Sequence, residues 1–140
     1  RDLGVTLLVE NNILTKGTLA ANGPDVLLMV SPDDITTAFE YLPSTVGLLL
    51  DVAHLEVSAY SLGFDPRKAL VALHPFTKAY HLSDTDTHND VAMPVKVGSW
   101  FWSELRPDVD YVTLEVSPSF GQSLSSQVTL TTSKLQTGYE

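Results

Sequence analysis

The chain has 140 residues, 44% hydrophobic and 18% charged, as expected of one globular domain over residues 1–140 with a buried core. Its 8 Lys and Arg against 17 Asp and Glu give a formal charge of −9, which disfavours nucleic-acid binding. The lack of cysteine excludes disulfides, thiolate metal sites and a cysteine nucleophile. No run approaches the roughly 18 apolar residues of a membrane span. The opening segment, residues 1–4, lacks the pattern of a secretory leader, so we expect a cytoplasmic protein.

The first predicted strand covers residues 5–9, a short aliphatic and β-branched run that ends at Glu10. Asn11 begins a stretch of polar and loop-forming residues that continues to residue 25. Residues 26–30 form a short apolar segment, which we expect to be extended. The strand therefore places a carboxylate at its carboxyl end.

A helix is predicted to follow, with Ser31 as N-cap and Pro32 at the first helical position. Two carboxylates then face the positive end of the helix dipole. Pro43 ends the helix. Its apolar positions recur at helical spacing: Ile35, Ala38, Phe39 and Leu42.

Residues 46–50 form a continuous apolar run that stops at Asp51, with His54 three positions later. Such a run predicts a strand buried on both faces, which delivers polar groups at its carboxyl end. Asp and His together suit a divalent metal or a polar substrate. The structural alternative is that Asp51 caps the next segment and His54 lines a loop.

The next helix is predicted to begin at Asp65-Pro66 and to end at His74, which we interpret as a helix-end residue without chemistry. Its inward stripe consists of Ala69, Leu70 and Leu73. Residues 77–80 predict a third strand that leads into His81. Residues 82–90 are too polar for regular structure and predict a loop at an active face.

Residues 98–105 predict a further helix, in which Trp100 and Trp102 serve packing. A fourth strand is expected at residues 110–114 and ends at Glu115. A last helix is expected around Leu124, Val128 and Leu135, and residues 138–140 are expected to be frayed.

Strand and helix thus alternate four times, which predicts an α/β fold with parallel strands. The carboxyl ends of parallel strands lie at one edge of the sheet. We therefore expect the polar residues at the four strand ends to share one site.

The strand ends resemble those of the xylose-isomerase-like TIM barrel superfamily, which includes sugar phosphate isomerases, sugar epimerases and endonuclease-IV-like enzymes. The resemblance covers residues 4–117 and rests on four motifs in order: Val9-Glu10-Asn11, Leu50-Asp51-Val52-Ala53-His54, Tyr80-His81-Leu82-Ser83-Asp84 and Leu114-Glu115-Val116. It implies four of the eight (β/α) units of a barrel, the carboxyl-terminal half. Another chain, a copy of this one or a missing amino-terminal half would complete it.

The resemblance implies a single divalent ion, Mn, Mg, Co or Zn, held by Glu10, Asp51, His81 and Glu115. It makes His54 a substrate-binding residue, and Asp84 and His88 in the polar loop are further candidates for that role. Epimerases tend to have an arginine in this loop, and Thr87 or His88 is nearest to it here.

The function implied is a metal-dependent isomerase or epimerase of carbohydrate metabolism, acting on a sugar, a sugar phosphate or another hydroxy-carbonyl compound. Glu10 and Glu115, on opposite sides of the substrate, would move the proton through an enediolate. One alternative is an endonuclease-IV-like phosphodiester hydrolase, although Ala92 stands where those members place a zinc-binding histidine. Another is a barrel fragment or binding module without catalysis. Neither a nucleic acid nor a membrane is expected as a partner.

Overall fold

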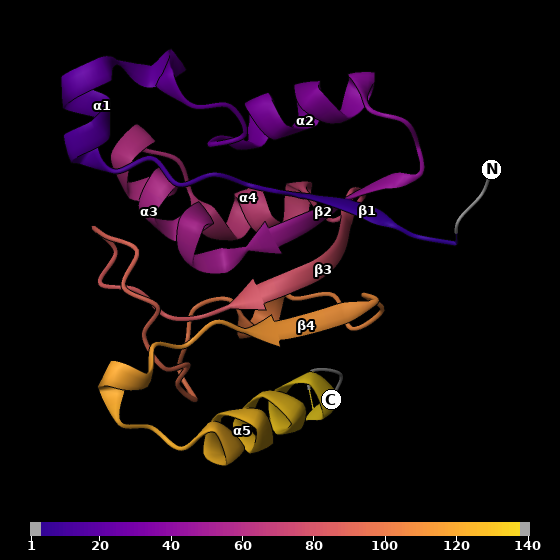
Figure 1. Ribbon diagram of the computed structural model, residues 1–140, viewed down its shortest axis with the longest axis vertical. Coiled ribbons are helices and arrows are strands. Elements are labelled where there is room, and N and C mark those ends of the chain that lie inside the picture. The colour runs from indigo at the N-terminus through magenta and orange to yellow at the C-terminus, as the bar shows by residue number, and fades with distance from the viewer. Residues whose placement is uncertain (1–3, 138–140) are drawn as a thin grey trace.

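The computed structural model describes residues 4–137 and is an α/β fold built on one parallel sheet (Figure 1). The strands lie in the order β1-β2-β3-β4, and each pairs in parallel with the next. The predicted parallel arrangement is therefore confirmed. The strands are β1 (Leu7–Glu10), β2 (Val46–Asp51), β3 (Thr77–Leu82) and β4 (Tyr111–Leu114).

Three of the four helices that the sequence predicted are present, namely α2 (Pro32–Tyr41), α4 (Pro66–Ala72) and α5 (Leu124–Thr137). Ser31 caps α2 by accepting a hydrogen bond from the Asp34 amide, and Asp65 caps α4 in the same way. The weakly periodic tail forms α5. The α-helices are α1 (Lys16–Asn22), α2 (Pro32–Tyr41), α3 (Val52–Leu62), α4 (Pro66–Ala72) and α5 (Leu124–Thr137), and the 3-10 turns are η1 (Pro24–Val26), η2 (Trp102–Glu104) and η3 (Pro118–Phe120).

Two segments differ from their predictions, and two helices, α1 and α3, were not expected. Residues 26–30 are not extended, because η1 is followed by bends and by Met29 with a φ of 62°. Helix α1 escapes prediction because it buries none of its residues and so carries no apolar stripe. The frayed end expected at residues 138–140 lies outside the described part of the chain.

The predicted helix over residues 98–105 is wrong, because this segment consists of turns with only the short η2. Phe101 is fully buried, and Trp100 and Trp102 on either side also pack against the core. A regular helix would point three consecutive side chains in three directions. The predicted packing role of the tryptophans is confirmed, and it is what favours the irregular backbone.

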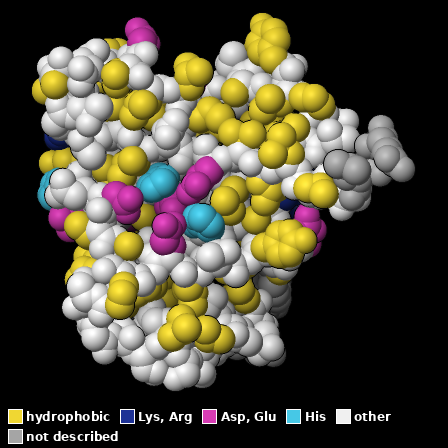
Figure 2. Space-filling model, viewed as in Figure 1, with side chains coloured by type: hydrophobic (Ala, Val, Ile, Leu, Met, Phe, Trp, Pro, Cys, Tyr) yellow, Lys and Arg dark blue, Asp and Glu magenta, His cyan; other side chains and the backbone are white. Residues whose placement is uncertain are grey.

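One face of the sheet is open. Helices α3 and α4 lie behind the sheet in Figure 1, whereas α2 and α5 lie beside its two edges. Leu49, Ala79 and Tyr111 are paired in register and share this face, where Tyr111 is 65% exposed and Leu49 is half-buried, while the small Ala79 is covered by its neighbours. Figure 2 shows acidic and histidine side chains grouped near the middle of this view, with hydrophobic side chains beside them.

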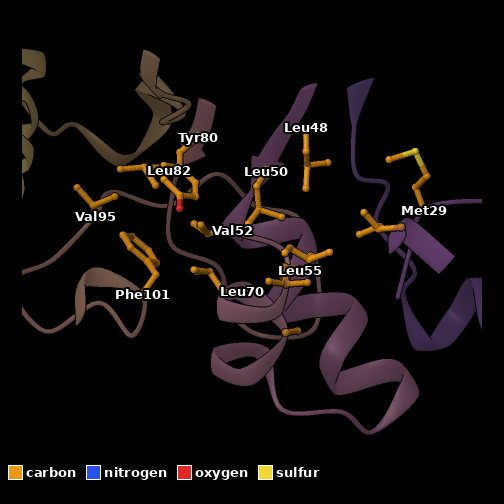
Figure 3. Packing of buried hydrophobic residues seen from close by; sticks show 13 residues of the cluster. Met29, Leu48, Leu50, Val52, Leu55, Leu70, Tyr80, Leu82, Val95 and Phe101 are labelled. Atoms are coloured by element: carbon orange, nitrogen blue, oxygen red, sulfur yellow. The ribbon is translucent and has the colours of Figure 1, made fainter. Parts of the chain in front are cut away.

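The opposite face of the sheet carries the core (Figure 3). Leu48 and Leu50 of β2 and Tyr80 and Leu82 of β3 are completely buried there. They pack against fully or nearly fully buried residues of the helices and of the 95–101 segment: Val52, Leu55, Leu70, Leu73, Val95 and Phe101. This packing fixes β2 and β3, and hence the position of their carboxyl ends. Among residues 4–137, no helix has the length and apolar character needed to span a membrane.

Candidate metal centre

The side chains at the four strand ends converge. One ligand atom from each lies within 4.8 Å of every other, and the four residues are the predicted set: Glu10, Asp51, His81 and Glu115. This convergence follows from parallel pairing, because the sheet brings the carboxyl ends of β1 to β4 to the same side. The sequence thus predicted which side chains would meet.

His81 lies at the centre of this group. Its Nδ1 atom is 3.1 Å from Oε1 of Glu10 and 3.1 Å from Oε2 of Glu115, and 3.8 Å from Oδ2 of Asp51. The Glu115 side chain is the most exposed of the four at 57%, and that of Asp51 is the least exposed at 2%. The group therefore has a buried floor and an open rim.

Asp51 serves two purposes with its two carboxylate oxygens. Oδ1 accepts hydrogen bonds from the amides of Ala53 and His54, at 2.8 and 2.9 Å, and so caps α3. Oδ2 points to the group instead, 3.8 Å from His81 and 3.9 Å from His54. The capping role and the site role, which the sequence left as alternatives, are compatible.

Burial raises the pKa of the Asp51 carboxyl above its usual value. The charge of the His54 side chain and the hydrogen bond from the His54 amide lower this pKa. The nearby charges of Glu10 and Glu115 raise it further. A carboxylate buried next to two like charges is costly without a cation. The floor of the site is thus suited to positive charge.

His54 belongs to the first turn of α3 and does not line a loop. Its Nδ1 atom lies 2.9 Å from the carbonyl oxygen of Asn11. Because a carbonyl only accepts, Nδ1 carries the proton and donates it. Nε2 then faces the site, 3.9 Å from Oδ2 of Asp51 and 3.4 Å from Oδ2 of Asp90.

Burial by itself would lower the pKa of His54, but its surroundings outweigh that effect and raise it. The largest opposing contribution is the charge of Asp51, followed by the hydrogen bond to Asn11 and the charges of Asp90 and Glu10. The imidazole therefore holds a proton more readily than a free histidine does.

Two residues near the group were not predicted as site residues. Asn11, which is 2% exposed, hydrogen bonds to both the amide and the carbonyl of Asp51. Asp90, at the end of the polar loop, approaches His54. Asn11 belongs to the Val9-Glu10-Asn11 motif of the resemblance but was interpreted as a turn former, and Asp90 ends the loop that was predicted at an active face without a role of its own.

The other predicted site residues lie outside the group of four. Asp84 is 8% exposed, its carboxylate accepts a 2.7 Å hydrogen bond from Ser99, and its backbone pairs with Met93. His88 is exposed and packs edge-on against Tyr60 with ring centroids 4.4 Å apart. These contacts anchor the polar loop, and a substrate role for Asp84 or His88 stays a prediction.

The donor set fits a divalent cation. Ligand atoms around an ion at about 2.1 Å lie about 3 to 4 Å apart, so a group within 4.8 Å needs only small side-chain movements to close. Three carboxylates suit Mg or Mn, and the single imidazole also admits Zn or Co.

His74 is not part of this group, as its interpretation as a helix-end residue requires. Its Nε2 atom lies 2.8 Å from the carbonyl oxygen of Glu104.

Comparisons with protein-family models, with curated proteins and with solved structures each found no match. The resemblance to xylose-isomerase-like barrels therefore stays a prediction that depends on the residues at the four strand ends.

Proposed function

We propose that the protein is a metal-dependent isomerase or epimerase of a sugar, a sugar phosphate or another hydroxy-carbonyl compound. The observation that carries the proposal is the convergence of three carboxylates and one imidazole at the carboxyl edge of a parallel sheet. This edge is where α/β enzymes place their chemistry. A bound divalent ion would polarise the substrate carbonyl and so make the neighbouring C–H acidic.

Glu10 and Glu115 are the proposed proton-transfer groups. Glu10 ends β1 and Glu115 directly follows β4, the two outer strands, so the site residues of β2 and β3 lie between them. A substrate above Asp51 and His81 would present opposite faces of its acidic carbon to the two carboxylates. One would remove the proton and the other would return it, which inverts a centre or moves the proton between adjacent carbons.

His54 is proposed to orient a substrate hydroxyl. Its Nδ1 proton is committed to the Asn11 carbonyl, so Nε2 is the atom available to substrate. Its side chain is 19% exposed, which leaves it accessible from the mouth of the site but unable to swing freely. A fixed imidazole suits orientation better than long-range proton transfer.

The protein is further proposed to work as half of a (β/α)8 barrel. Within residues 4–137, the outer strands β1 and β4 each have one unpaired edge, and parallel sheets are rarely left open to solvent on one face. Four more strands, from a second copy or from a separate half, would cover the face that carries Leu49 and Tyr111. They would also close the site on its open side.

The test is solvent exchange in D₂O. The metal-loaded protein, in whichever assembly completes the barrel, is incubated with a panel of ketoses and ketose phosphates. The proposal expects deuterium on the carbon next to the carbonyl of the true substrate, seen by NMR. Turnover of a panel member without label would point to hydride transfer and contradict the proposal. Cleavage of abasic DNA together with an unlabelled panel would favour the hydrolase alternative instead.

A further inference from the structure

We infer that Asn11 is a positioning residue, which holds Asp51 and His54 in the arrangement that the site requires. Three hydrogen bonds connect it to them. Its side-chain Oδ1 accepts from the Asp51 amide at 2.7 Å, its Nδ2 donates to the Asp51 carbonyl at 3.1 Å, and its own carbonyl accepts from His54 at 2.9 Å.

The side chain of Asn11 continues the sheet where the backbone leaves it. The pairing of β1 with β2 ends at Glu10 and Leu49, two residues before β2 itself ends. Beyond that point the Asn11 side-chain amide bonds to both the N–H and the C=O of Asp51, which backbone groups of a neighbouring strand would otherwise bind. The last residue of β2 is thereby paired on its β1 side although the chain has already turned away.

Because the Asn11 side chain takes the place of a backbone pairing, the main chain of Asn11 can turn towards α3. The turn is held at its start by the side-chain hydrogen bonds of Asn11 to Asp51, and after Asn11 by the Asn12 amide, which donates to the Met29 carbonyl, and the Leu14 amide, which donates to the Ser58 hydroxyl. It aims the Asn11 carbonyl at Nδ1 of His54, which selects the tautomer with Nε2 directed into the site. One buried residue therefore sets the position of Asp51 and the orientation of His54.

A matched control exists at the next position. Asn12 is exposed, and its Nδ2 donates to the Leu28 carbonyl at 2.9 Å, away from the site. Asn11→Ala and Asn12→Ala thus each remove one asparagine amide from the same turn. Only the first removes contacts to the site.

The experiment measures the His54 tautomer in the metal-free protein by ¹⁵N NMR at alkaline pH. The wild type and Asn12→Ala are expected to show a protonated Nδ1. Asn11→Ala keeps the residue-11 carbonyl but loses the two side-chain hydrogen bonds to Asp51 that hold this carbonyl against His54, so a mixture of both tautomers is expected. If Asn11→Ala does not fold, Asn11→Ser takes its place, because its hydroxyl is uncharged and can replace at most one of the two amide hydrogen bonds to Asp51. An unchanged His54 tautomer in the folded variant would overturn the inference.

This role of Asn11 rests on the proposed metal site, so Mn²⁺ affinity is measured on the same samples. Loss of an orienting contact is expected to weaken binding about ten- to hundredfold in Asn11→Ala and not in Asn12→Ala. Mn²⁺ binding of equal strength in all three proteins would also overturn it. Absence of Mn²⁺ binding in the wild type would instead reject the proposed metal site, while the tautomer measurement would still decide the role of Asn11.

Discussion

Trp100 and Glu56 are joined by a 2.8 Å hydrogen bond from the indole Nε1 to the carboxylate Oε2. The other oxygen of Glu56 accepts the hydroxyl of Thr87 in the polar loop at 3.1 Å. One carboxylate on α3 therefore fastens two irregular segments beside the site. Burial raises the pKa of Glu56, and the two hydrogen bonds oppose that rise without cancelling it.

Glu56→Gln is expected to stabilise the protein relative to wild type as the pH rises from acid to neutral. Because the folded-state pKa of Glu56 is raised, its favourable contribution is complete below the unfolded-state pKa and is lost as the pH rises through the folded-state pKa. Glutamine has no ionisation to lose and can still bond to both Thr87 and Trp100. Urea unfolding of both proteins at acid and neutral pH measures the difference.

Glu104→Gln is the control, because the pKa of Glu104 is lowered where that of Glu56 is raised. Hydrogen bonds from Ser103 and Arg67 lower the pKa of Glu104, so its contribution exists above the unfolded-state pKa and is lost as the pH falls. The variant should therefore lose stability at neutral pH and approach wild type in acid. The same pH trend in both variants would contradict the assignment for Glu56.

Gly47→Ala is expected to destabilise the sheet by about 1 to 3 kcal/mol. A Cβ atom at residue 47 would lie 2.4 Å from Cγ of Lys78 and 3.0 Å from Cδ2 of Leu8, and the crowded Lys78 atoms lie close to its backbone. Gly17→Ala in α1 meets only Thr15 at 3.7 Å and should not destabilise. Thermal melts of the two variants compare them directly, and equal melting temperatures would refute the crowding.

The open sheet should be closed by association. We expect light scattering to show the protein as a dimer, or as a complex once a second half is supplied, because in the described part of the chain β1 and β4 each have an unpaired edge. Amide hydrogen exchange should then be slowest in the complex at the edges of these two strands. A monodisperse monomer with all four strands protected would contradict the half-barrel proposal.

Glu10→Gln and Glu115→Gln are expected to retain some ligand binding and to lose nearly all turnover, because glutamine can still contact a ligand but cannot accept a proton. Deuterium exchange into the substrate, measured for each variant, separates the two roles. If either variant exchanges label at the wild-type rate, that glutamate is not a proton-transfer group.

The sequence was sufficient for the parts of the fold that depend on local signals. Ser31 and Asp65 mark helix starts by the same hydrogen bonds that the structure shows, and the apolar run before Asp51 is a central strand. Parallel strands then determine that Glu10 and Glu115 meet His81, although they are far apart in the chain.

The parts that the sequence could not provide depend on tertiary contacts. Nothing local distinguishes Asn11 from an ordinary turn residue, since its partner Asp51 is 40 positions away. The segment around Phe101 has helical spacing, but the demand of consecutive aromatic side chains for the same core overrides it. Asp90 approaches His54 from a loop that a hydrogen bond between Thr87 and Glu56 fastens to α3, a tertiary contact with no local signal.

Mn²⁺ titration followed by EPR tests the central claim most directly, because bound and free Mn²⁺ have different signals. The wild type and His74→Ala should each bind one ion per chain, and Asp51→Asn and His81→Ala should bind far less. No binding by the wild type, or binding that survives both site substitutions unchanged, would contradict a metal centre at these four strand ends.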